Sequence, residues 1–215
     1  MLLPRDFFAR PSVEVAPDLL GCVLEHATAQ GLVAVRITEV EAYAGASDPA
    51  SHAYRGKTAR NAVMFGPPGH AYVYFTYGMH FCVNLVCLGD TESVSASAVL
   101  LRAGEIVAGE GLARARRTRG PAVVASRDLA RGPARLCQAL AIDRALDGAD
   151  ACVPSSPLRV RSGAGTPPRS VKILTGPRVG VSRAAEIPWR FWLEGDPTVS
   201  VYRPAVPRRR KLVTP

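Results

Sequence analysis

The chain has 215 residues, of which 27 are Lys or Arg and 18 are Asp or Glu, so its formal charge is +9. The length suits one large domain or two small ones, and an apolar content of 47% excludes wholesale disorder. The sequence contains no stretch of about 18 apolar residues, which a membrane-spanning helix would need. Residues 1–6 also lack the apolar core of a secretory signal. We therefore expect a cytoplasmic protein with no membrane partner.

The first half of the chain predicts one helix, one long strand and a β-hairpin. Residues 12–24 follow a proline and place Leu and Val side chains on one helical face. Residues 31–43 alternate in the manner of a half-buried strand. A polar, glycine-rich loop over 44–69 follows. Two β-rich segments, 71–76 and 80–88, then flank the three residues of a tight turn.

The second half of the chain predicts shorter elements. An apolar strand covers 99–102, and helices are expected over 105–117 and 133–142. The second of these helices opens with Gly132-Pro133, and proline is favoured at the first position of a helix. Turn residues separate five further short strands, at 158–161, 171–174, 178–182, 190–194 and 198–202.

This mixture predicts a single α+β domain, built mostly on an antiparallel β-sheet with flanking helices and a protruding β-hairpin. No internal repeat or linker separates two cores, so we place the domain at residues 1–202. Residues 203–215 carry a run of three arginines and a lysine between prolines, without core residues to anchor it. We expect this basic tail to be disordered.

The positive charge comes almost entirely from arginine, because Lys57, Lys172 and Lys211 are the only lysines. Arginine binds phosphate through two parallel hydrogen bonds and stacks on bases, so this excess favours an anionic polymer as partner. A GC-rich genome would raise the arginine content as well, and composition leaves both explanations open. The five cysteines are scattered without metal-ligand or redox spacing, so we expect reduced thiols, no metal and no cofactor.

Residues 49–89 contain no Asp or Glu, and they interleave aromatic side chains with the cations Arg55, Lys57 and Arg60. Such a surface suits contact with phosphates and the stacking of bases. Tyrosines are also good strand formers, which explains the tyrosines inside the strands but explains Tyr77 poorly. At the tip of the hairpin, Tyr77 could insert between base pairs or fold back on its own strands, and its position leaves both open.

The strand over 31–43 places Glu39 and Glu41 on the same predicted face as its apolar side chains. A carboxylate in partly buried surroundings can accept a proton from a water molecule and align the oxygen for attack. Two carboxylates about 7 Å apart, by strand rise, also resemble the acid and base of glycosidic-bond hydrolysis. Taken alone, the pattern favours the alternative that both are rim residues in ion pairs.

Three further polar residues stand out in loop or apolar segments. His52 lies in the polar loop, where a lone histidine is usually solvated. Asn84 lies within an apolar strand, so its amide needs partners and either bridges the structure or lines a pocket. Arg102 ends an apolar strand, a position from which a cation can meet a carboxylate or a phosphate.

From about Leu3 to Tyr202, the chain resembles the alkyladenine (3-methyladenine) DNA glycosylases of base-excision repair. The resemblance rests on ordered blocks at family spacing, which are Thr38-Glu39-Val40-Glu41-Ala42-Tyr43, Ser51-His52, Arg60-Asn61 with Met64-Phe65, Tyr72-Val73-Tyr74-Phe75-Thr76-Tyr77-Gly78-Met79, Phe81-Cys82-Val83-Asn84, Val99-Leu100-Leu101-Arg102, Gly132-Pro133-Ala134-Arg135-Leu136-Cys137-Gln138-Ala139-Leu140 and Arg178-Val179-Gly180-Val181. So many blocks in one order are far more specific than a single short motif.

The resemblance implies a monomeric, metal-free enzyme that flips a damaged purine out of duplex DNA and hydrolyses its N-glycosidic bond. Its substrates would be alkylated or deaminated purines such as 3-methyladenine, hypoxanthine and ethenoadenine. By the same resemblance, Glu41 would activate the attacking water. Arg102 would help to hold that water or a nearby phosphate.

The resemblance also implies how the base is held. Tyr43, His52 and Tyr74 would sandwich the extruded base, and Asn84 would disfavour guanine by crowding its exocyclic amine. Tyr77 would fill the gap left in the double helix. No lysine is placed to form a Schiff base with the sugar, so we expect the abasic strand to stay uncut.

Two other classes of protein remain as alternatives. A noncatalytic binder of damaged or bent DNA would use the same basic surface and the Tyr77 wedge, but would release no base. Such a binder has no need for Glu41 in an aromatic pocket, where its charge would repel phosphates. A small-molecule hydrolase or transferase would leave Tyr77 and the arginine excess without a role.

Overall fold

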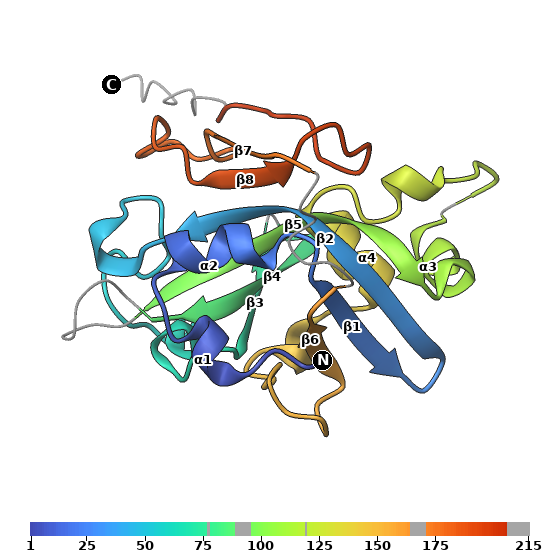
Figure 1. Ribbon diagram of the computed structural model, residues 1–215, viewed down its shortest axis with the longest axis horizontal. Coiled ribbons are helices and arrows are strands. Elements are labelled where there is room, and N and C mark those ends of the chain that lie inside the picture. Colours follow the sequence, from blue (N-terminus) through green and yellow to red (C-terminus); the bar gives the residue numbers. More distant parts are fainter. Residues whose placement is uncertain (77, 89–95, 119, 164–170, 206–215) are drawn as a thin grey trace, which may run out of the picture.

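The computed structural model describes residues 1–76, 78–88, 96–118, 120–163 and 171–205 (Figure 1). Its helices are α1 (Arg5–Phe8), α2 (Ser12–Leu19), α3 (Glu110–Arg117) and α4 (Pro133–Leu140). Its strands are β1 (Val23–Thr28), β2 (Gly31–Tyr43), β3 (Ala71–Thr76), β4 (His80–Cys87), β5 (Ser97–Ala108), β6 (Leu158–Arg161), β7 (Ile173–Gly176) and β8 (Arg190–Leu193). Short 3₁₀ helices lie at Gly45–Ser47, Ala62–Phe65, Ser126–Asp128 and Arg144–Leu146.

The strands form one antiparallel sheet in the order β3-β4-β5-β2-β1-β6, with β7 and β8 attached beside β2. The long strand β2 organises this sheet, because β5 pairs along one of its edges and two strands share the other. β1 pairs with residues 31–36 of β2, whereas β8 pairs with residues 39–41. The sheet therefore divides in the middle of β2, and the C-terminal segment joins it there. This arrangement confirms the predicted α+β class.

Two β-bulges at the centre of the β2–β5 pair change which side chains face the core. The pairing register shifts at Thr38, an extra residue on β2, and shifts back at Arg102, an extra residue on β5. A bulge re-aims side chains because the alternation of faces restarts after the extra residue. Before the bulge, the core side chains of β2 are Val33, Val35 and Ile37.

After the bulge, the core side chains of β2 are Val40 and Ala42. Since neighbouring side chains of a strand alternate, Glu39 and Glu41 point to the opposite face, toward β8 and the C-terminal segment. The prediction that both carboxylates continue the apolar face of the strand is wrong. The cause is the bulge, after which the apolar core positions of β2 change from odd numbers to the even-numbered Val40 and Ala42.

Two predicted helices are shorter than expected, because glycines in the left-handed conformation interrupt them. The helix predicted over 12–24 ends at Leu19, and Gly21, with a φ of +84°, turns the chain into β1. β5 runs through the predicted start of the helix over 105–117. Gly109, with a φ of +74°, then separates this strand from α3.

The remaining predictions divide between confirmed and corrected elements. The strand over 31–43, both hairpin strands, the strand at 158–161 and the helix start at Pro133 are confirmed, as is the strand at 190–194 to within one residue. The strand predicted at 171–174 lies two residues later. Residues 178–182 and 198–202 form loops rather than strands. The backbone N–H groups of Val179 and Ser200 bind carboxylate side chains of β2 instead of joining a backbone ladder.

Helices α2 and α4 pack on the sheet and complete its main hydrophobic core. α2 contributes Val15, Ala16 and Leu19, which share one helical face, and α4 contributes Leu136 and Leu140. A second, smaller cluster holds the 44–69 loop against the hairpin strands and β5, and it consists of Ala53, Met64, Tyr72, Val86, Ala96 and Ala98. This second cluster supports the pocket described below.

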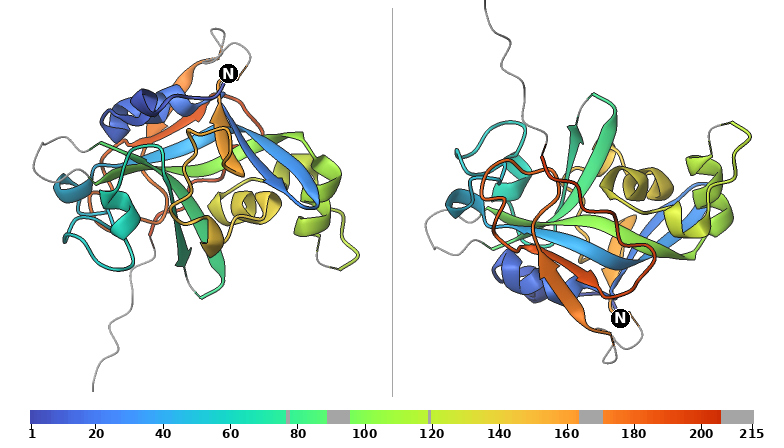
Figure 2. Two further views of the ribbon diagram at one scale, coloured as in Figure 1. Left: turned by 90° about the horizontal axis from the view of Figure 1, so that it is seen from below. Right: turned by 90° about the horizontal axis from the view of Figure 1, so that it is seen from above.

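The β3–β4 hairpin extends beyond the rest of the sheet in both views of Figure 2, which confirms the predicted protruding hairpin. Tyr77, which the sequence places at its tip, lies outside the described residues, as does the tail from residue 206. The C-terminal segment that contains β7 and β8 lies across β2 (Figures 1 and 2). None of the described helices has the length and hydropathy that crossing a bilayer requires.

Candidate active site

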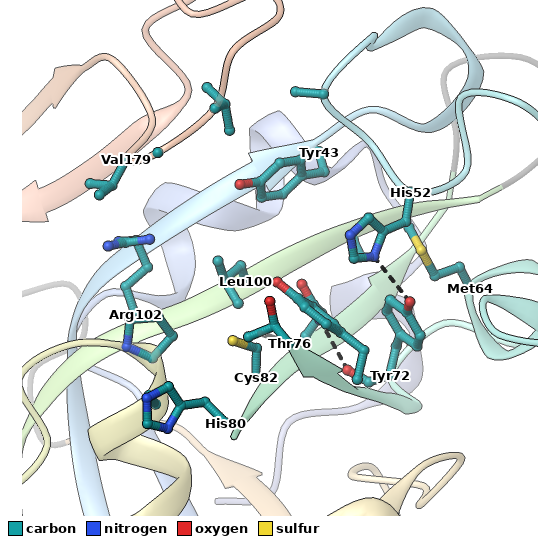
Figure 3. A pocket seen from close by; sticks show the side chains of 18 of the residues that line it. Tyr43, His52, Met64, Tyr72, Thr76, His80, Cys82, Leu100, Arg102 and Val179 are labelled. Carbon is teal, nitrogen blue, oxygen red and sulfur yellow. Dashed lines mark hydrogen bonds between the residues drawn. The ribbon is translucent and has the colours of Figure 1, made fainter. Parts of the chain in front are cut away.

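A pocket of about 510 Å³ lies between the hairpin strands, β5, the 44–69 loop and the C-terminal segment. We call it the main pocket. Five residues that the sequence singled out line it together, and they are Tyr43, His52, Tyr74, Asn84 and Arg102. They come from β2, the loop, β3, β4 and β5, so the curl of the sheet assembles the site from segments far apart in the chain. Figure 3 shows Tyr43, His52 and Arg102 around this pocket.

Glu41 lies directly behind the wall of the main pocket and is fully buried. The Tyr43 hydroxyl donates a hydrogen bond of 2.8 Å to Oε2 of Glu41, and Arg102 Nη1 lies 3.2 Å from the same oxygen. The backbone N–H of Val179 donates a hydrogen bond of 2.6 Å to Oε1. All three partners line the pocket, so only a single layer of residues separates the carboxylate from the cavity.

Arg102 is buried and joins the two carboxylates of β2. Its Nε donates a 2.8 Å hydrogen bond to Oε1 of Glu39, while its Nη1 faces Glu41. Burial disfavours the charge of Arg102, yet the two carboxylates outweigh burial and raise its pKa far above the ordinary value. Arg102 is therefore a permanent cation at the side of the pocket.

Glu39 is neither a rim residue nor part of the pocket lining, because its side chain is fully buried. Arg190 Nε donates a 2.7 Å hydrogen bond to Oε1, and the backbone N–H of Ser200 donates one of 2.6 Å to Oε2. Burial opposes its ionisation, but the charges of Arg102 and Arg190 and the Ser200 N–H together lower the pKa of Glu39. The expected ion pairs exist, but they lie inside the protein.

The aromatic side of the main pocket is built by His52, Tyr72 and Tyr74. The rings of His52 and Tyr74 meet edge to face, with their centroids 4.6 Å apart. His52 Nδ1 and the Tyr72 hydroxyl share a 3.0 Å hydrogen bond (Figure 3). Burial, and then the charge of Arg60, lower the pKa of His52, so its imidazole is neutral at neutral pH.

Tyr43 forms the other aromatic wall of the pocket. Burial and the neighbouring Glu41 carboxylate raise the pKa of Tyr43 well above its usual value, so its hydroxyl keeps its proton. The Arg178 guanidinium lies 4.7 Å from the centroid of the Tyr43 ring. Because Arg178 itself does not line the pocket, Tyr43 has a cation beside it and still presents ring surface to the cavity.

Arg178 and Asp48 have structural roles that their sequence context does not predict. Both side chains are fully buried, and they form a two-point ion pair in which Arg178 Nη2 is 2.9 Å from Asp48 Oδ1. Arg178 also donates a 3.0 Å hydrogen bond to the Ala42 carbonyl. These contacts hold the segment that begins at Val179 against β2. The family block that starts at Arg178 indicates that this segment matters. The strand expected over residues 178–182 does not predict the ion pair.

Asn84 is buried in β4, and its side-chain amide donates a 3.0 Å hydrogen bond to the Tyr72 carbonyl. Because Asn84 also lines the main pocket, it is both a structural bridge and a pocket-lining group. The two readings of Asn84 that the sequence left open are therefore compatible. The hydrogen bond to the Tyr72 carbonyl fixes the orientation of its amide beside the cavity.

The three cations proposed for DNA contact lie outside the main pocket, and their surroundings differ. Arg55 and Lys57 are exposed in the 44–69 loop. Arg60 is also exposed, but it lies 5.8 Å from the centroid of the Tyr74 ring and donates a 3.2 Å hydrogen bond to the Phe75 carbonyl. Arg60 thus supports the hairpin in addition to carrying charge.

Among the residues that the structure describes, no three His, Cys, Asp or Glu side chains gather as a metal site would require. The five cysteines are free thiols. Cys82 lines the main pocket, and burial raises its pKa, so it is a neutral thiol there. The groups in and around this pocket include one carboxylate behind the wall, one buried arginine and several aromatic rings.

Known proteins resemble the chain over nearly its whole length. The family model of the methylpurine-DNA glycosylases (MPG) matches residues 6–197. A relative from Streptomyces avermitilis is 59% identical over 211 residues, which cover 97% of this chain and 95% of the relative. Relatives from Leifsonia xyli subsp. xyli and Methanocella arvoryzae are 54% and 48% identical, covering 93% and 94% of this chain and 92% and 98% of their own.

All three relatives carry 3-methyladenine DNA glycosylase in their names. Both the family match and these identities extend across the hairpin, β2, β5 and the C-terminal segment that build the main pocket. The chain therefore belongs to the methylpurine-DNA glycosylase family, whose hydrolases serve base-excision repair of DNA.

Proposed function

We propose that the protein flips damaged purines out of duplex DNA into the main pocket and hydrolyses their N-glycosidic bonds with a water activated by Glu41. Alkylated and deaminated purines, such as 3-methyladenine, hypoxanthine and ethenoadenine, are the expected substrates. The observation that carries this proposal is the position of Glu41, a buried carboxylate whose partners Tyr43, Arg102 and Val179 all line the pocket.

In the proposed reaction, Glu41 accepts a proton from the water while the water oxygen attacks C1′ of the sugar. The N-glycosidic bond breaks, its electron pair leaves with the base, and the strand keeps an abasic sugar. In the free protein, Tyr43 and Arg102 both contact Oε2 of Glu41, so a water can reach that oxygen only if one of them moves. In the proposed reaction the Tyr43 hydroxyl moves away and the water takes its place. Arg102 then holds the water or a neighbouring phosphate.

The flipped base would lie between Tyr43 on one side and His52 and Tyr74 on the other. Stacking on such rings favours electron-poor and cationic purines, which leave without a proton donor. A neutral lesion such as hypoxanthine needs hydrogen bonds from the pocket as charge develops on it. Asn84, with its amide fixed on the Tyr72 carbonyl, would crowd the exocyclic amine of guanine and so exclude this normal base.

The remaining expectations concern the DNA duplex. Tyr77 would fill the space that the flipped nucleotide leaves, and Arg55, Lys57 and Arg60 would contact the phosphate backbone. The described residues that line the pocket include no lysine, which supports hydrolysis without cutting of the abasic strand. We expect the protein to act as a monomer in the cytoplasm, with no metal or cofactor.

The direct test is to incubate the purified protein with duplexes that contain hypoxanthine, ethenoadenine or 3-methyladenine. The proposal expects free base, together with an abasic strand that is cut only after alkali treatment. Cleavage of the strand without alkali would contradict the proposed hydrolysis by water. Salt-sensitive binding of the damaged duplex with no release of base would instead favour the noncatalytic binder.

A further inference from the structure

Glu39 is a buried carboxylate that the proposed reaction does not use. Its Oε1 accepts hydrogen bonds of 2.8 Å from Arg102 Nε, 2.7 Å from Arg190 Nε and 2.9 Å from the Ser200 hydroxyl. Its Oε2 accepts the 2.6 Å hydrogen bond from the Ser200 backbone. These donors come from β5, β8 and the loop after β8, so one carboxylate joins three elements behind the main pocket.

Each nitrogen of the Arg102 guanidinium contacts a different acceptor. Nε binds Glu39, Nη1 faces Glu41, and Nη2 donates a 3.4 Å hydrogen bond to the Ser200 hydroxyl. Because the guanidinium is planar and rigid, fixing Nε on Glu39 determines where Nη1 lies. Glu39 therefore helps to set the geometry in which Nη1 of Arg102 meets Glu41.

The charges behind the pocket balance only when Glu39 is present. We call the two carboxylates Glu39 and Glu41 with the two guanidiniums Arg102 and Arg190 the four-charge cluster. With Glu39 ionised, the cluster holds two negative and two positive charges. Without that carboxylate, one positive charge beside Glu41 would have no partner, and Glu41 would be held more strongly as an anion.

Other groups around Glu41 do not replace Glu39. Tyr43, Tyr74 and Cys82 interact electrostatically with Glu41, and burial raises the pKa of each, so all three are neutral. Arg178 also feels the charge of Glu41, but it is paired with the buried Asp48. Among the described residues around Glu41, the charge that compensates Arg102 and Arg190 is therefore that of Glu39.

We propose that Glu39 is a positioning residue of the glycosylase, which orients Arg102 and balances its charge so that Glu41 remains able to take a proton from water. This inference rests on the proposed role of Glu41. It adds that the orientation and the charge balance of Arg102, the cation in contact with Glu41, depend on a second carboxylate that does not line the main pocket. Removing Glu39 would make Glu41 a weaker proton acceptor, whereas removing Arg190 would have the opposite electrostatic effect.

The test follows base release from a hypoxanthine duplex in single-turnover experiments across the pH range. For Glu39→Gln, we expect the acid side of the pH–rate profile to shift by about one pH unit to lower pH. The maximal rate should fall by up to about 100-fold, because Arg102 loses its anchor. For Arg190→Gln, we expect the acid side to shift to higher pH, and the double variant should return toward the wild-type position.

The opposite shifts separate charge balance from a purely structural role. A lower rate or a lower melting temperature with the acid side unmoved, or with both single variants shifted alike, would overturn the inference. If Glu39→Gln does not fold by circular dichroism, the direction of the Arg190→Gln shift decides. Glu14→Gln, an exposed position on α2, is the matched control and should leave the profile unchanged.

Failure of the proposed function would look different in the same experiment. A wild-type protein that releases no base, or a Glu41→Gln variant as active as the wild type, would contradict the role given to Glu41. A wild-type protein that depends on Glu41 but shows no shift in Glu39→Gln would contradict only the role given to Glu39. The two ideas are thus tested separately.

Discussion

The backbone N–H of Val179 donates a 2.6 Å hydrogen bond to Oε1 of Glu41, which lies 138 positions earlier in the chain. This contact places the C-terminal segment directly on the carboxylate of β2. The preceding residue, Arg178, anchors the same segment through its buried ion pair with Asp48. Residues that lie far from β2 in the chain therefore build the wall of the main pocket near Glu41.

The ion pair between Arg178 and Asp48 should be important for stability. Asp48→Asn leaves the Arg178 charge buried without its partner, so we expect a loss of about 3–5 kcal/mol in the free energy of unfolding. Urea denaturation of the variant and the wild type measures this loss. Asp18→Asn is the matched control, because Asp18 pairs with Arg10 at a half-exposed site and should cost no more than about 1 kcal/mol. Equal losses in the two variants would contradict the account.

The stacking role of Tyr74 predicts a specific loss of binding. Tyr74→Leu removes a ring from the pocket wall, so affinity for a duplex with a flipped damaged base should fall by about 1–3 kcal/mol. Affinity for undamaged duplex should hardly change, because that binding depends on phosphate contacts. Tyr202→Leu, at an exposed tyrosine outside both the pocket and the 49–89 segment, is the control. An equal loss on damaged and undamaged duplex would argue against stacking.

Glu39 predicts a pH dependence of stability. Its pKa in the folded protein is below the ordinary value of 4.5. Its ionised form therefore stabilises the fold fully above about pH 4.5, and this stabilisation is lost as the pH falls from there through the lower folded-state pKa. The wild type should unfold at higher urea concentration than Glu39→Gln at pH 7, and the difference should shrink below pH 4.5. A difference that grows on acidification would contradict this reading.

Much of the fold could be predicted because local patterns decide it. The alternation over 31–43, the two β-rich segments around a tight turn and the Pro133 helix start reappear as β2, the β3–β4 hairpin and α4. Tyr74 and Asn84 of the hairpin line the main pocket, as the family resemblance implies. The alternation of the strands themselves predicts the hairpin, but it does not distinguish a pocket tyrosine from an ordinary strand tyrosine.

Contacts between distant parts of the chain determine the features of the site that the sequence did not predict. The bulge at Thr38 arises from the register between β2 and β5, and it moves Glu39 and Glu41 from the apolar face to the opposite one. The role of Val179 likewise depends on a single hydrogen bond to β2 rather than on a strand of its own. The change of phase between Ile37 and Val40 is visible in the sequence, but only the pairing with β5 shows that it is a bulge. The Val179 hydrogen bond leaves no periodic signal, because its partner lies far away in the chain.

The central claim is that Glu41 supplies the base for hydrolysis, and Glu41→Gln tests it most directly. The substitution keeps the shape of the side chain but removes its capacity to take a proton. The measurement is single-turnover release of hypoxanthine from a duplex, with binding of the same duplex measured in parallel. We predict that the variant binds the duplex as the wild type does but releases base at least about 100-fold more slowly. Release at the wild-type rate would contradict the account.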